Sequence, residues 1–211
     1  MNRVKAVVFD MDGVLIDARE WHYLALNEAL NPFGFTITFE MQKTTFEGLP
    51  TKSKLDILSN EFGFPRELHS IVSKLKQDRT LRLASANCYP NVSHQILLER
   101  ISRLGLKIGL YTNSIRETTN FMLAYAKLNH FLDKVITNED VLEPKPSPEG
   151  YIRICRELEV NPDEVLVVED GMYGIQAAKA AGCRVIKVSG PEEVSIEKIM
   201  AELPELIQKN D

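Results

Sequence analysis

Residues 6–17 read Ala6-Val7-Val8-Phe9-Asp10-Met11-Asp12-Gly13-Val14-Leu15-Ile16-Asp17, a short apolar run that ends in two aspartates. The run is apolar at consecutive positions, which is typical of a strand buried on both faces of a parallel sheet. Gly13 suits a tight turn directly after such a strand. Because ligands bind at the carboxyl ends of parallel strands, the two aspartates are candidate functional residues.

Four more short apolar runs follow, and helical patterns separate them. The runs lie at residues 108–111, 135–137, 165–168 and 185–188, and the helical patterns at residues 92–104, 113–126, 148 onwards and 171–181. We expect Asn113 or Ser114 to cap the second of these helices. Alternating strands and helices predict an α/β fold, with a doubly wound, Rossmann-like parallel sheet as its core.

Residues from about 19 to 84 interrupt this alternation. They contain helical periodicity at residues 20–30, 51–62 and 65–83, and no convincing buried strand. We therefore predict a helical cap domain, residues 17–84, inserted into a catalytic core formed by residues 1–16 and 85–211. Asp17 is expected to cap the helix that enters the insertion.

Composition and charge exclude several classes of protein. The 211-residue chain has a formal net charge of −5, so it is not expected to bind nucleic acid through the phosphate backbone. No apolar run is long enough to span a membrane, and no signal peptide is expected. Three scattered cysteines indicate reduced thiols rather than a disulfide framework. We expect a cytoplasmic monomer that acts on a small molecule.

Polar side chains also follow two other predicted strands, the second and the fourth, and one lies in the loop between the third and the fourth. They are Thr112 and Asn113, then Lys145, then Glu169 and Asp170. In a parallel sheet these groups converge on the edge that holds Asp10 and Asp12. Clustered carboxylates are suited to Mg²⁺, and a lysine, a hydroxyl and an amide can hold phosphoryl oxygens. Together they predict phosphoryl transfer, which needs mainly positioning and charge neutralisation.

The four motifs, in this order, resemble those of the haloacid dehalogenase superfamily of phosphatases, and they cover almost the whole chain. The resemblance implies that Asp10 is the nucleophile, with Asp12 as the general acid/base. It implies that Thr112, Asn113 and Lys145 bind the phosphoryl group. The implied Mg²⁺ ligands are Asp10, Asp12 through its backbone carbonyl, Asp170, and Glu169 either directly or through water.

Within this family, the phosphoglycolate phosphatases and β-phosphoglucomutases are most similar. By resemblance, His22 is a candidate to steer Asp12, although a packed helix residue is an equal alternative. Gly48 lies in a segment that resembles the substrate-specificity loop, and Lys52 could meet a distal anionic group or be solvated. Thr51 stands where the mutases carry an arginine that grips a second phosphate. This departure favours a phosphatase over a mutase.

Three hypotheses remain open. The first is a phosphatase for a small phosphorylated metabolite, and the second is a sugar-phosphate mutase that uses the same nucleophile. The third is a binding module on the same fold, which the full set of polar residues disfavours. Dehalogenases of the superfamily lack the second aspartate of the first motif, so Asp12 also disfavours halide chemistry.

Overall fold

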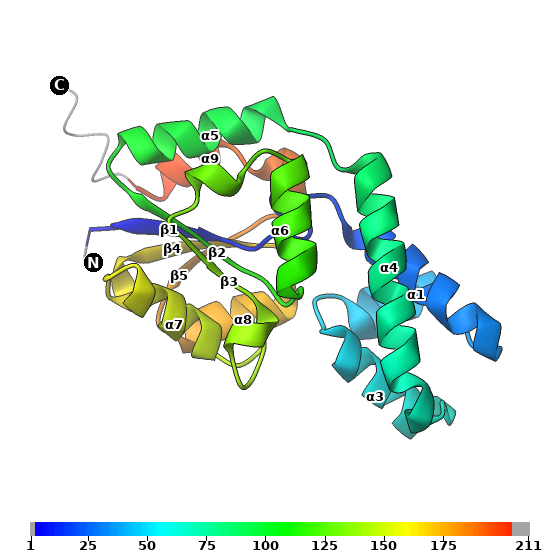
Figure 1. Ribbon diagram of the computed structural model, residues 1–211. Helices are drawn as coiled ribbons and strands as arrows, with labels where there is room; N and C mark the ends of the chain where they lie inside the picture. The colour runs from blue at the N-terminus through cyan, green and yellow to red at the C-terminus, as the bar shows by residue number, and fades with distance from the viewer. Residues whose placement is uncertain (1–2, 204–211) are drawn as a thin grey trace.

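The computed structural model describes residues 3–203, which form a parallel sheet flanked by helices and a separate group of helices at one end (Figure 1). The sheet has five strands in the order β3-β2-β1-β4-β5. All neighbouring strands pair in parallel, so the expected doubly wound sheet is confirmed. The strands are β1 Ala6–Phe9, β2 Lys107–Tyr111, β3 Lys134–Ile136, β4 Val165–Glu169 and β5 Arg184–Lys187.

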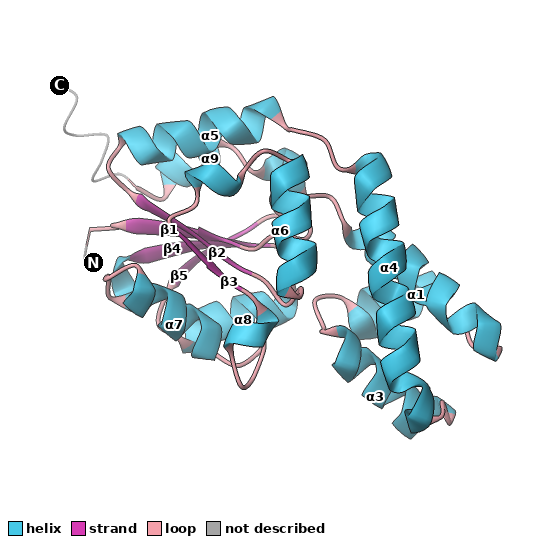
Figure 2. Ribbon diagram, viewed as in Figure 1, coloured by secondary structure: helices cyan, strands magenta, loops and turns pink. Residues whose placement is uncertain are grey.

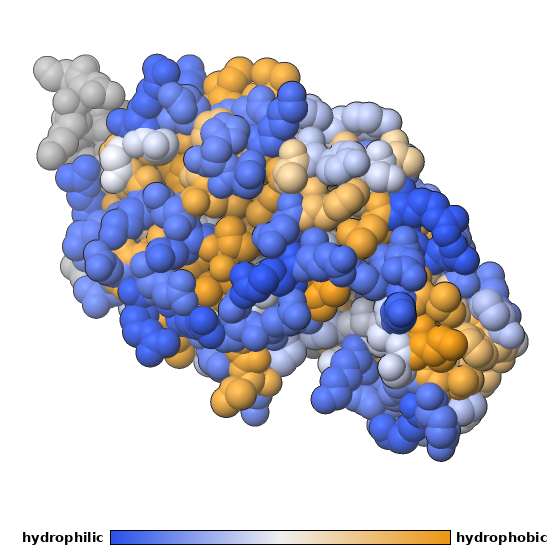
Figure 3. All heavy atoms as spheres, viewed as in Figure 1, coloured by the Kyte–Doolittle hydropathy of each residue, from blue (hydrophilic) through white to orange (hydrophobic). Residues whose placement is uncertain are grey.

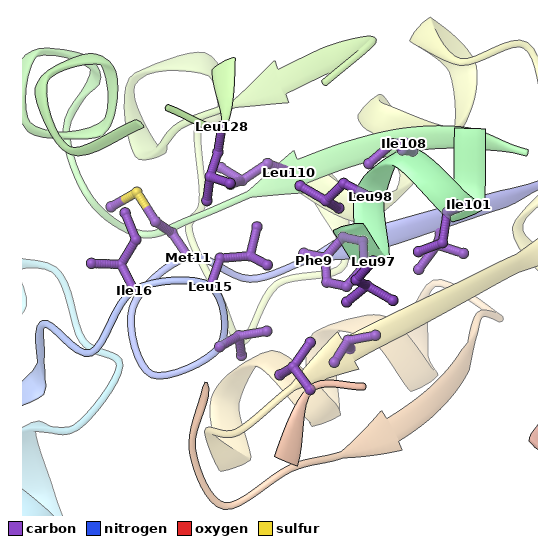
Figure 4. Close-up of a cluster of buried hydrophobic side chains, with 14 of the residues drawn as sticks. Phe9, Met11, Leu15, Ile16, Leu97, Leu98, Ile101, Ile108, Leu110 and Leu128 are labelled. Carbon is purple, nitrogen blue, oxygen red and sulfur yellow. The ribbon is translucent and has the colours of Figure 1, made fainter. Parts of the chain in front are cut away.

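The central strand β1 is buried on both faces, as its continuous apolar sequence predicts. Val7 and Phe9 pack into one core cluster, which receives helices α5, α6 and α9 (Figures 2 and 4). Ala6 and Val8 point to the opposite side, where α7 and α8 pack. The helices of this part are α5 Val92–Arg103, α6 Arg116–Tyr125, α7 Glu149–Glu157, α8 Met172–Ala180 and α9 Ile196–Ala201.

The register of the sheet aligns the strand ends that carry polar residues. Phe9 is paired with Leu110 of β2 on one side and with Val168 of β4 on the other. Asp10, which follows Phe9, therefore lies beside the ends of both neighbouring strands. This alignment brings motifs that are far apart in sequence to one edge of the sheet.

The remaining helices belong to residues 19–87, which we call the cap. They have a hydrophobic core of their own, in which Leu26, Phe46, Leu55 and Val72 are all buried. Helix α4 packs along α1 and also contacts α6, where Gln77 accepts a hydrogen bond from Thr118 at 2.9 Å. The elements are α1 Arg19–Leu30, α2 Phe39–Met41, the π-helical turn η2 Gln42–Phe46, α3 Thr51–Phe62 and α4 His69–Asn87.

Two capping predictions are wrong. The residue before α1 is Ala18, and no side chain caps that helix, so Asp17 does not act as its cap. Ile115 precedes α6, again without a side-chain cap. Asn113 and Ser114 make contacts within the site instead, as described below. In both places the helix begins one or more residues after the position that was predicted from the polar residue.

Candidate active site

Asp10 is buried at the end of β1 and bonded to Lys145, whose side chain is 4% exposed. The Lys145 Nζ donates to Asp10 Oδ1 at 2.6 Å, to Glu169 Oε1 at 2.5 Å and to the Tyr111 carbonyl at 3.0 Å. Burial opposes the charge on Lys145, but Asp10 and Glu169 outweigh it and raise the Lys145 pKa above its usual value. Lys145 is therefore a fixed cation between two carboxylates.

A third carboxylate completes a cluster that could hold a metal ion. Oxygens of Asp10, Glu169 and Asp170 lie within 4.8 Å of one another. Burial raises the pKa of Asp10 well above its ordinary value, and the neighbouring carboxylates add to this effect while Lys145 opposes it. Burial and Glu169 raise the pKa of Asp170 to about 7. A divalent cation with oxygen ligands would relieve this repulsion, so the donor set fits Mg²⁺.

The turn after β1 shapes the space beside Asp170. Gly13 has a φ of +86°, and a Cβ at this position would lie 2.0 Å from Asp170 Oδ2. Arg19 approaches the same carboxylate, with Nη1 3.8 Å from Asp170 Oδ2, and Nη1 donates to the Ser189 carbonyl at 2.9 Å. The absence of a side chain at Gly13 thus leaves room for the Asp170 carboxylate.

Glu169 is oriented by several donors. Besides Lys145, the Tyr151 hydroxyl donates to Glu169 Oε1 at 3.0 Å. The backbone N–H groups of Asp170 and Gly171 donate to Oε2 at 3.1 and 3.2 Å. Protein donors thus occupy both oxygens, which favours contact with a metal through water.

Asp12 has a different environment, although it lies only two residues from Asp10. Ser114 Oγ donates to Asp12 Oδ2 at 2.7 Å, so Ser114 contacts the site rather than capping a helix. His22 Nε2 lies 3.1 Å from Asp12 Oδ1, although neither of these atoms has a well-aligned hydrogen bond. Burial favours the protonated acid, but His22 and Ser114 outweigh it and lower the pKa of Asp12.

His22 is held from its other side by Lys76 of the cap. The Lys76 Nζ lies 3.0 Å from His22 Nδ1, and an ammonium group can only donate. Nδ1 is therefore the acceptor, and the ring proton lies on Nε2, facing Asp12. Burial, followed by the Lys76 charge, lowers the pKa of His22, while Asp12 opposes this shift. The sequence left two interpretations of His22 open, a residue that steers Asp12 and a packed helix residue. The structure places His22 beside Asp12.

Thr112 and Asn113 lie at the end of β2, and the Asn113 side chain joins the cap to the core. Asn113 Nδ2 donates to the Gly48 carbonyl at 2.7 Å, and Asn113 Oδ1 accepts from the Lys145 N–H at 3.1 Å. The Asn113 amide is thus engaged with the protein. Thr112 is 1% exposed, and its Oγ1 accepts from the Ser114 N–H at 3.0 Å.

A cavity of about 300 Å³ lies between the cap and these strand ends. Of the proposed cap residues, His22, Gly48 and Lys52 all line it, and Lys52 is exposed. Other lining residues were missed by the sequence predictions, among them four with polar side chains that bear on the chemistry below: Arg19, Gln42, Lys54 and Lys76.

None of these four carries a local signal for a site. Lys54 and Lys76 read as polar positions on amphipathic helices, and Gln42 lies in a turn that has no motif. Only Lys54 could have been suspected, because it follows Thr51 by three residues and so shares its side of α3.

Comparison with known proteins identifies the family. The haloacid dehalogenase-like hydrolases match residues 7–188. The chain belongs to this family. It is 27% identical over 179 residues to the phosphorylated carbohydrates phosphatase of Thermotoga maritima, covering 85% of this chain and 82% of the relative. It is also 27% identical over 188 residues to the fructose-1-phosphate phosphatase of Escherichia coli, covering 88% and 97% of the two chains.

The solved structures agree on the fold. A β-phosphoglucomutase from Clostridium difficile superposes with a TM-score of 0.82 and 22% identity, covering 98% of this chain and all of that one. The expected enzyme class, a phosphatase of this family, is confirmed by the relatives. No helix within residues 3–203 is long and apolar enough to cross a membrane.

Proposed function

We propose that this enzyme is a magnesium-dependent phosphatase that hydrolyses a small phosphorylated metabolite through a phosphoryl group carried on Asp10. The observation that carries the proposal is the surroundings of Asp10. Its carboxylate is bonded to Lys145, lies in a three-carboxylate cluster and opens on the cavity that Asp12 also lines. The relatives named for phosphorylated carbohydrates and fructose 1-phosphate support a sugar phosphate as substrate.

In the first step, a carboxylate oxygen of Asp10 attacks phosphorus and the bond from phosphorus to the substrate oxygen breaks. Asp12 gives its proton to that leaving oxygen. Lys145 favours the ionised form of Asp10, against the effect of burial, and with Thr112 binds phosphoryl oxygens. Mg²⁺, held by Asp10, the Asp12 carbonyl and Asp170, would neutralise negative charge on the carboxylates and the phosphoryl group.

In the second step, Asp12 acts as a carboxylate and removes a proton from water. The water oxygen attacks phosphorus, the bond to Asp10 breaks, and inorganic phosphate leaves. The hydrogen bond from Ser114 and the nearby His22 favour the ionised form of Asp12, which suits this step. Lys76 positions His22 for the task.

The test is the variant Asp10→Asn, assayed with an aryl phosphate and Mg²⁺. We expect turnover to fall by about 10³-fold or more, because the amide keeps the shape of the side chain and loses its nucleophilic charge. Acid-quenched wild-type enzyme should carry a phosphoryl group on the peptide that contains Asp10. Retained turnover in the variant, or a label on another residue, would contradict the mechanism.

A mutase is the second candidate. Thr51 disfavours it, because the mutases carry an arginine at this position that grips a second phosphate, but two cations of the cap weaken that argument. Lys54 and Lys76 line the cavity and could retain a second phosphate. Product analysis separates the two functions, because a phosphatase releases inorganic phosphate and a mutase returns an isomeric sugar phosphate. The three free, buried cysteines support the further expectation of a reducing, cytoplasmic location.

A further inference from the structure

Lys54 is a buried cation whose role the proposed mechanism does not explain. It lies on α3, is 6% exposed and lines the cavity beneath the cap. Within residues 3–203, its ammonium group has no hydrogen-bond or ion-pair partner. Lysine is among the residues least often buried, and a buried one is normally paired. An unpaired ammonium that faces a cavity therefore points to an anionic ligand.

Three other charged groups that line the cavity, Lys145, Arg19 and Asp12, are already engaged with other partners. Lys145 is bonded to two carboxylates, and Arg19 to the Ser189 carbonyl near Asp170. Asp12 accepts a hydrogen bond from Ser114 and faces His22. Glu47, a carboxylate of the cap that also lines the cavity, offsets part of the Lys54 charge through space, but within residues 3–203 it forms no hydrogen bond or ion pair with Lys54.

Two other cap side chains stand beside the same space. Lys76, which contributes a second positive charge, lies on α4, and within residues 3–203 its ammonium group has a hydrogen bond to His22 alone. Gln42 is 7% exposed, and its side-chain oxygen is buried without a hydrogen-bond donor. Burial and Lys76 lower the pKa of Lys54 to about 7, while Asp12 and Glu47 oppose this shift. The free protein thus maintains a repulsive, underbonded arrangement that a bound anion would relieve.

We propose that Lys54, with Lys76 and Gln42 beside it, forms a second anion subsite in the cap. It rests on the proposed function, in which the scissile phosphoryl group lies at Asp10. The preferred substrates are then phosphate monoesters that carry a second anionic group at their far end, either a carboxylate or a second phosphate. The cavity of about 300 Å³ limits them to small metabolites.

The test compares matched pairs of ligands that differ in the charge of one end. One pair is glycerol 3-phosphate and 3-phosphoglycerate, which adds a carboxylate. The other is fructose 1-phosphate and fructose 1,6-bisphosphate, which adds a phosphate. Each compound is titrated as a competitor of aryl phosphate hydrolysis, so that a ligand that binds without being hydrolysed still gives an inhibition constant.

We expect the anionic member of at least one pair to bind at least about tenfold more tightly than its neutral partner, as for one charge-assisted hydrogen bond. The pair that shows the preference identifies the group as a carboxylate or a phosphate. The Lys54→Met variant should lose most of this ratio, and Lys54→Arg should keep it. Lys74→Met, an exposed position on α4 outside the cavity, is the matched control.

Equal binding within both pairs, or an unchanged ratio in Lys54→Met, would overturn the subsite. Thermal melting of that variant excludes misfolding, because removing an unpaired buried charge should leave the protein at least as stable. The aryl phosphate itself tests the proposed function separately. Wild-type enzyme that does not hydrolyse it with Mg²⁺ contradicts the phosphatase, whereas hydrolysis without pairwise preference contradicts only the subsite.

Discussion

Asp10 and Asp12 are the same residue type at the same strand end, yet the protein surrounds them differently. Asp10 contacts Lys145 and the carboxylates of Glu169 and Asp170, so its charge depends on nearby cations. Asp12 faces away from that cluster, toward Ser114 and His22. This separation suits a nucleophile and a proton carrier that must act on opposite sides of one phosphoryl group.

The Lys54 charge should also be visible in protein stability. Its pKa is lowered from the ordinary lysine value to about 7, mainly by burial and by Lys76, with Asp12 and Glu47 opposing. Below pH 7 the amine is charged in both folded and unfolded chains, so the folded state bears the full burial cost. Between about pH 7 and 10.5 only the unfolded chain is charged, and stability therefore rises with pH.

We expect Lys54→Met to raise the melting temperature of the ligand-free protein most at pH 6 to 7, and progressively less toward about pH 10. Thermal melts of wild type and variant at each pH give the difference between their melting temperatures. The contributions of other titrating groups cancel in this difference. Lys74→Met should show no such trend. A constant difference from pH 6 to 10 would mean that Lys54 is not a strained buried cation.

At the scale of single elements, the turn after β1 links the backbone to the carboxylate cluster. Gly13 adopts a left-handed conformation, and its missing side chain makes room for Asp170. The apolar period of β1 and the glycine were both readable from the sequence. The helix caps predicted at Asp17 and Ser114 were wrong, so not every local pattern could be read correctly. A polar residue near a helix start can bond to another part of the protein instead of capping the helix, as Ser114 does with Asp12.

Gly13→Ala should damage the metal site beyond the cost of backbone strain. The added Cβ would meet the Asp170 oxygen, so that carboxylate must move. We expect the Mg²⁺ concentration for half-maximal activity to rise by about tenfold or more, because disturbing the orientation of a metal ligand typically lowers metal affinity by this factor. A magnesium titration of the rate measures this effect.

Gly34→Ala is the matched control, since Gly34 has a similar φ of +74° but nothing within 4 Å of the added atom. Both variants should lose about 1 kcal/mol or somewhat more of stability from the left-handed alanine. Only Gly13→Ala should change the magnesium requirement. An equal requirement in the two variants would remove Gly13 from the metal site.

The whole molecule combines two separately packed hydrophobic regions with a polar cavity between them. The sheet is covered on both faces, and the cap has its own cluster around Leu26 and Phe46. The hydrogen bonds that join them include Asn113 to Gly48 and Thr118 of α6 to Gln77. Figure 3 shows a face on which hydrophilic residues predominate, with hydrophobic patches both over the cap and over the part that contains the sheet. The predicted boundaries after residues 16 and 84 stay a prediction, and α4 continues to Asn87.

Because the two hydrophobic regions are packed by apolar side chains and not by the carboxylate cluster, removing the metal should stop catalysis without unfolding the protein. We expect excess chelator to abolish phosphate release and added Mg²⁺ to restore it. Metal binding should also raise the melting temperature, since it binds the folded state alone and relieves repulsion among carboxylates. Activity assays and thermal melts, with and without chelator, measure both effects.

The variant Asp170→Asn is the control for that experiment, because it removes one ligand and part of the repulsion. Its melting temperature should respond little to Mg²⁺. Full activity of the wild type in excess chelator would contradict the metal site. Unfolding of the metal-free protein at room temperature would contradict the independence of the core.

The sequence by itself determined the parallel α/β core, the helical insertion and the meeting of Asp10, Thr112, Lys145 and Asp170. These follow from short-range patterns, because buried strands of a parallel sheet align their ends whatever else the chain does. Only the tertiary structure decided which cap side chains face the site. Lys76 meets His22 across 54 residues, and Ser114 meets Asp12 across 102. Such contacts depend on how the cap helices lie over the sheet edge, and no local period encodes that orientation.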